Sequence, residues 1–159
     1  MKPGDLLALL RAIYQDKSAL RRRHEAGARR VGRYLFNNTY QYIIAREDTH
    51  LGWLRDGIEG MGGILPDPPA APAVDPTGSE REIISADLDA VRGFVERWRT
   101  KIETVTNARH RLMLTLLMGE TLEQQRFFEQ ALAGRADLLG RRTSGPETAG
   151  SVVSTRWME

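Results

Sequence analysis

LPDPPAAPAVDPTGS, residues 65–79, divides this 159-residue chain into two halves, because it holds five of the seven prolines. Proline is the residue that a helix interior tolerates least, since it lacks a backbone N–H and its ring clashes with the preceding turn. The flanking segments, residues 4–62 and 79–139, contain no proline, and each is long enough for two helices. The sequence therefore predicts two helical hairpins joined by an extended, proline-rich crossover.

Apolar residues at helical spacing locate two helices in the first half. The first is expected to begin near Asp5, a plausible N-cap, and the second to begin near Phe36 and stop at Gly62-Gly63. No proline marks the turn between them, so we place it within the glycine-rich residues 27–32. His24 lies next to three arginines and near this turn, which favours an exposed position.

The second half carries clearer helix boundaries. Ser79 and Glu82 form a Ser-x-x-Glu capping box, which predicts that the third helix begins there. The fourth is expected to open at Thr106 or Asn107 and to close at Gly134. The fold class predicted is thus all-α: an antiparallel four-helix bundle over residues 1–140, with the crossover at 64–79 and a C-terminal tail at 141–159.

Composition excludes several classes of function. The chain has no cysteine, which rules out disulfides, thiol catalysis and cysteine-bound metals, and favours a cytoplasmic location. Its apolar runs are too short for a membrane span. The net charge is only +2, and the arginine clusters at 21–23, 29–30 and 141–142 are separated and lie near acidic residues. We interpret them as solvated helix faces, so a nucleic-acid partner is not expected.

Carboxylates and an imidazole fall on stripes that are otherwise apolar. In IIAREDTHLGWL, residues 43–54, Glu47 and His50 have the Glu-x-x-His spacing that places both side chains on one helix face. In the fourth helix, Glu120 lies on the predicted inward stripe with Glu123 beside it. A buried charge must be paired or bound to a cation, so Glu47 and His50 are either a hydrogen-bonded pair or metal ligands, whereas Glu120 and Glu123 are either solvated or metal ligands.

Two further acids lie about one hairpin length upstream of these positions. Asp16 precedes Glu47 in the first hairpin, and Asp87 precedes Glu120 in the second. If each hairpin turns near its midpoint, both pairs lie at about the same height in the bundle. The candidate metal ligands from the sequence are therefore Glu47, His50, Glu120, Glu123, Asp16 and Asp87.

With these residues the chain resembles the ferritin-like superfamily, which includes ferritins, rubrerythrins and related di-iron carboxylate proteins. The resemblance spans roughly residues 6–132 in architecture and is carried by Glu47, His50, the following HLGWLRDGIEGMGG, and Glu120 within GETLEQQRFFEQAL. It implies a site for iron or manganese, dinuclear in type, with oxidoreductase or ferroxidase activity. Asp16 and Asp87 stand where the superfamily usually has Glu.

The fourth helix departs from the superfamily pattern, because Glu123 stands where a histidine is expected after Glu120. The resemblance then leaves three outcomes: a site completed by Glu123 or Gln124, a site reduced to one metal, or a bundle that has lost its metal. In the last case the chain is a helical interaction module of a larger assembly that keeps a relic of the site.

The C-terminal tail and the surface suggest partners. After Gly140 the sequence becomes polar and rich in glycine, serine and threonine, and it ends with Val152, Val153 and Trp157 as apolar anchors. We expect a homo-oligomer, and a protein partner that docks through this tail.

Overall fold

The computed structural model describes residues 1–70, 72–73 and 77–139, and within these ranges it is an all-α bundle. The helices are α1 (Pro3–Ala28), α2 (Tyr34–Gly60), α3 (Glu80–Glu103) and α4 (Ala108–Leu132). The predicted fold class is confirmed, with the α1–α2 and α3–α4 hairpins each packed closely. The C-terminal tail lies outside the described residues, as do positions 71 and 74–76 of the crossover.

Helix ends follow the local chemistry that the sequence offers. At α3 the predicted capping box is present: the Ser79 hydroxyl accepts from the Glu82 N–H, and the Glu82 carboxylate accepts from the Ser79 N–H. Asn107 caps α4, as predicted, by accepting from the His110 N–H. Gly62 and Gly134 have positive φ angles, 74° and 92°, and end α2 and α4 in the left-handed backbone that glycine adopts without strain.

The first helix begins earlier than predicted. Its N-cap is Lys2, and Pro3 occupies the first turn, where a missing N–H costs nothing. Asp5 therefore does not cap α1 but lies in its first turn, where a negative charge interacts favourably with the helix dipole. The turn between α1 and α2 falls at residues 29–33, close to the predicted position.

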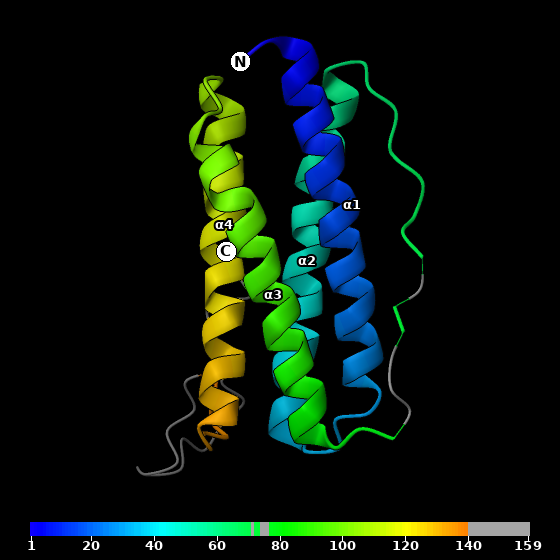
Figure 1. Cartoon of the computed structure of the whole chain (residues 1–159), viewed down its shortest axis with the longest axis vertical. Helices are drawn as coiled ribbons and strands as arrows, with labels where there is room; N and C mark the ends of the chain where they lie inside the picture. Colours follow the sequence, from blue (N-terminus) through cyan, green and yellow to red (C-terminus); the bar gives the residue numbers. More distant parts are fainter. Residues whose placement is uncertain (71, 74–76, 140–159) are drawn as a thin grey trace, which may run out of the picture.

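Each helix runs antiparallel to both of its neighbours, and the crossover passes along the outer side of α1 (Figure 1). Two arginines fix the crossover: Arg22 of α1 donates to the carbonyl of Pro69, and Arg30, in the turn after α1, donates to that of Gly78. The core draws on all four helices; its fully buried members are Leu10, Ile13, Ile43, Leu54, Ile58, Val91, Leu114 and Leu117. Among the described residues, no helix has the length and apolar character that a membrane span requires.

Candidate functional site

A layer of polar side chains crosses the apolar core about halfway along the bundle. Its members come from three helices and are all essentially without solvent exposure: Lys17, His24, Glu47, His50, Thr121 and Gln124. The predicted positions Glu47 and His50 are among them. Burying so many polar groups is costly unless they satisfy one another, so their contacts define what this layer can do.

Lys17 is the centre of this layer. Its ammonium nitrogen donates to the Thr121 hydroxyl over 3.0 Å and lies 3.5 Å from Glu47 Oε1. It also lies 5.1 Å from the centre of the Phe94 ring, so the cation faces the ring of an α3 residue. One lysine on α1 thereby contacts side chains of the other three helices.

Glu47 is held between two basic groups. Its Oε2 accepts from His24 Nδ1 over 2.9 Å, while Oε1 faces Lys17. Burial alone raises the pKa of Glu47, but His24 and Lys17 outweigh it, and the pKa of this carboxyl lies below its ordinary value. Burial lowers the pKa of Lys17, and Glu47 opposes that shift. Glu47 therefore has a basic nitrogen of the chain itself beside it inside the core.

His50 belongs to a second group at the edge of the layer. Its Nε2 donates to Glu120 Oε2 over 2.7 Å, and Arg46 binds the same carboxylate through two hydrogen bonds of 2.8 and 2.6 Å. Burial and the charge of Lys17 lower the pKa of His50 to about 4 although Glu120 opposes them, so the imidazole is neutral at pH 7. Burial raises the pKa of Glu120, but Arg46 and His50 outweigh it and keep the group ionised.

Of the six predicted ligands, the structure brings His50 and Glu120 into direct contact and places Glu47 in the same layer. Asp16 is instead bound to α3, where it accepts hydrogen bonds from Trp98 Nε1 and Arg97. Asp87 is buried elsewhere, accepting from the Tyr40 hydroxyl over 2.5 Å and from Arg23 over 2.8 Å. Glu123 is half-buried.

The layer does not fit a dinuclear carboxylate centre. Such a centre takes one Glu from each of two helices and a Glu-x-x-His from each of the other two. Here Glu47 and His50 supply the α2 pair, whereas Lys17 extends into the layer from α1 and the aligned α4 pair at the same spacing is Thr121 and Gln124. Phe94 is the α3 residue that faces Lys17. Within the described ranges, no three His, Asp or Glu side chains are arranged to hold a metal ion. Bound iron or manganese stays a prediction.

Five buried polar atoms in this layer have no hydrogen-bond partner among the described residues. They are His24 Nε2, Glu47 Oε1, His50 Nδ1, Gln124 Nε2 and Gln124 Oε1. Because Nε2 of the neutral His50 ring donates to Glu120, Nδ1 of that ring is an acceptor. The layer thus keeps capacity for a small polar guest, of which water is the simplest.

Three residues of the layer, Lys17, His24 and Thr121, were not predicted from the sequence. His24 is fully buried, so the expectation that it is exposed near a turn was wrong; α1 continues past it to Ala28. Lys17 also carried a signal, because Leu6, Leu10, Ile13, Lys17, Leu20 and His24 follow alternating steps of three and four residues. The ligand predicted on this helix, Asp16, is one position away from the inward residue, Lys17.

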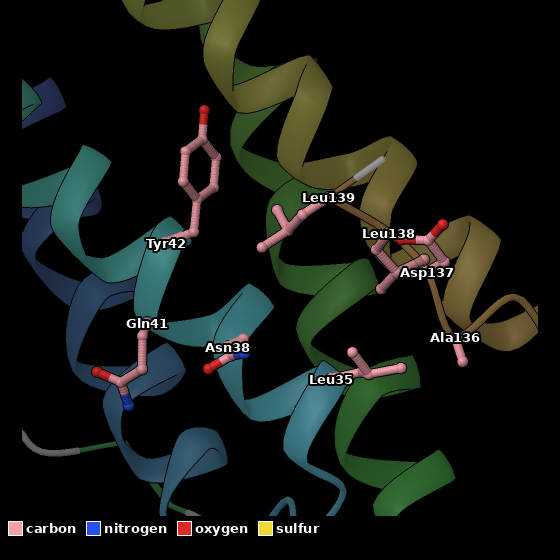
Figure 2. Close-up of a pocket in the computed structure, with 8 residues that line it drawn as sticks. All are labelled: Leu35, Asn38, Gln41, Tyr42, Ala136, Asp137, Leu138 and Leu139. Carbon is pink, nitrogen blue, oxygen red and sulfur yellow. The ribbon is translucent and has the colours of Figure 1, made fainter. Parts of the chain in front are cut away.

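A separate pocket of about 270 Å³ lies between the start of α2 and the residues that follow α4 (Figure 2). Asn38, Gln41 and Tyr42 line one wall, and residues 136–139 form the other. The lining offers two amides, the phenol of Tyr42, the carboxylate of Asp137 and apolar side chains.

Neither a family model, nor a curated protein, nor a solved structure matches the chain. The fold is therefore assigned from its own helices: an all-α four-helix bundle, compatible in architecture with a ferritin-like fold.

Proposed function

We propose that this chain is a non-catalytic helical interaction module, in which an internal lysine takes the role that a metal ion has in di-iron carboxylate bundles. The observation that supports the proposal is Lys17 Nζ, which lies between Glu47 and Thr121 in the buried polar layer. An ammonium at this position balances the interior carboxylate. A bundle neutralised in this way needs no ion to fold, and it presents no open coordination position to a substrate.

An interaction module of this kind acts by binding partners through its surface. Among the described residues, large apolar side chains remain exposed on α4, with Leu112 63% and Leu116 51% accessible. Such side chains, when adjacent, are typical of protein contacts. A second copy of the chain and a protein partner are the two classes of binder that we propose; docking through the C-terminal tail stays a prediction.

The experiment is a metal analysis of the purified full-length chain from cells grown with added iron and manganese. We expect far less than one metal per chain in the wild type and the same result in Glu47→Gln. The proposal fails if iron or manganese is present near one per chain and is lost in Glu47→Gln.

A metal-binding function is the second candidate, and the five unpartnered polar atoms favour it. Two imidazole nitrogens, a carboxylate and an amide oxygen are donor types suited to iron or manganese, although among the described residues no three His, Asp or Glu side chains are arranged around one ion. Lys17 opposes this function, because its ammonium lies beside the carboxylate that the ion would need. Lys17→Met separates the two candidates: added Fe(II) or Mn(II) raises the melting temperature of that variant, and not of the wild type, only if the ammonium is what excludes the ion.

A further inference from the structure

The exposed face of α4 is unusual in its order of residue types. Leu112 and Leu116 are spaced by four residues, so both lie on one side of the helix. Gly119 continues the same stripe, and a Cβ built on it meets nothing within 4 Å. Arg109 stands at one end of the stripe, fully outside the core, and Glu123 at the other.

The stripe borders a cleft of about 300 Å³ between α2 and α4. Trp53 and Gly57 of α2 form one side, and Met113 and Leu116 of α4 form the other. The α4 stripe and this cleft together make a continuous surface with apolar side chains at its centre and charged residues at its ends. An interface between proteins typically has this composition, an apolar centre with a polar rim.

We propose that this surface is a two-fold symmetric interface, at which α4 of one copy packs antiparallel against α4 of a second copy around Leu116. The inference rests on the proposed function as an interaction module, and it names the partner and the surface. A two-fold interface requires a surface that is complementary to itself, with residue i facing j and j facing i.

The sequence of the stripe meets this requirement. Arg109 and Glu123 each lie seven residues from Leu116, so antiparallel packing places the guanidinium of one copy opposite the carboxylate of the other. Leu112 and Gly119 lie four and three residues from Leu116, so antiparallel packing brings the leucine of one copy within about one residue of helix rise, roughly 1.5 Å, of the level of the other copy's glycine. Parallel packing would instead set Arg109 against Arg109, which charge repulsion disfavours.

The test is sedimentation velocity of the full-length chain from 1 to 100 µM, a range chosen around typical micromolar dissociation constants. We expect a dimer that dissociates on dilution. Leu116→Glu, at the centre, is expected to raise the dissociation constant by at least about 100-fold, because each copy loses an apolar contact and gains a buried charge. Thr100→Glu, on an exposed position of α3, is the matched control and leaves it unchanged.

A charge exchange tests the antiparallel register. Arg109→Glu and Glu123→Arg each weaken the dimer, and the double variant restores it, because only antiparallel packing brings the two positions together. Circular dichroism checks that each variant folds. Leu112→Ser removes a second apolar side chain from the stripe and should also weaken the dimer. A wild type that is monomeric at 100 µM overturns the inference, as does a Leu116→Glu variant that still forms the dimer.

These outcomes are distinct from failure of the proposed function. A monomer that contains no metal contradicts only the two-fold interface, while metal bound near one per chain contradicts the proposed function whatever the oligomeric state.

Discussion

Lys17 and Glu47 are both fully buried, so water cannot take the place of either side chain if the other is removed. Removing one partner of such a pair leaves an uncompensated charge in the core. We expect Lys17→Met to lower the free energy of unfolding by about 3–5 kcal/mol, measured by urea denaturation. Lys17→Met with Glu47→Leu should recover most of the loss, because the core then holds no unpaired charge. A single variant as stable as the wild type would show that the pair is not ionised in the folded chain.

His50 makes stability depend on pH in a defined window. Its pKa is about 4 in the folded chain against an ordinary value of 6.5, so between these values the unfolded chain binds more protons. The stabilising contribution of the neutral ring is fully present above pH 6.5 and is lost as the pH falls to 4. We expect a loss of about 3 kcal/mol over this window, measured by urea unfolding at a series of pH values.

Protonation of Glu47 and Glu120 in acid also lowers the free energy of unfolding, because the pKa values of both groups in the folded chain lie below the ordinary ones. His50→Gln separates their effect, because it keeps an amide N–H for Glu120 but does not titrate. The variant should show a shallower loss between pH 6.5 and 4. An identical slope in both proteins would mean that the carboxylates alone cause the acid sensitivity.

At the scale of the helices, two glycines test where close packing constrains the sequence. A Cβ at Gly27, near the end of α1, would lie 2.7 Å from Asp87 Oδ2 and 3.0 Å from the Tyr40 ring. A Cβ at Gly93, in the middle of α3, meets nothing within 4 Å. Alanine is favoured over glycine inside a helix by about 1 kcal/mol. We therefore expect Gly93→Ala to raise the melting temperature and Gly27→Ala to lower it, and stabilisation by both would contradict the packing of α1 on α3.

The polar layer differs from a dinuclear metal centre in the residues that α1 and α4 supply to it. Lys17→Glu adds a carboxylate on α1, and Thr121→Glu with Gln124→His gives α4 the same Glu-x-x-His that α2 already has. We expect the triple variant to bind Co(II), Fe(II) or Mn(II) with micromolar or tighter affinity, measured by calorimetry, where the wild type binds none. Substituting Glu47→Gln in the triple variant is the control and should remove the binding.

Helix number and most helix ends were predictable because they depend on local signals, the start of α1 being the exception. The Ser79 capping box and the Asn107 cap each act within a few residues of sequence, and both are confirmed. The side of a helix that faces the core is harder to predict, since adjacent positions differ by only about a quarter turn. Glu120 and Thr121 both lie near the inward stripe of α4, and only packing against α1 decides that Thr121 meets Lys17.

The composition of the layer could not be derived from residue types alone. A lysine is usually at the surface, so its residue type gives no reason to include Lys17 in the inward stripe of the first helix. What makes its burial tolerable is Glu47 on another helix, a contact between residues far apart in the sequence. Asp87 was predicted to join the site and is indeed buried, but its hydrogen-bond partners are Tyr40 and Arg23 and not members of the layer.

At the scale of the whole molecule, all four helices share one core, and the internal cation belongs to the chain itself. Unfolding should therefore be one cooperative transition that does not depend on bound ions. We expect the thermal unfolding curves measured by far-ultraviolet and near-ultraviolet circular dichroism to coincide, because Trp98 is buried in the core that the helices share.

A chelator such as EDTA should leave the midpoint of thermal unfolding unchanged, because only a bound ion that stabilises the folded state would make the midpoint fall when it is removed. If the midpoint falls on chelation and recovers with added iron or manganese, the metal-binding candidate replaces the metal-free module, and Lys17 must then lie beside the ion as a neutral amine.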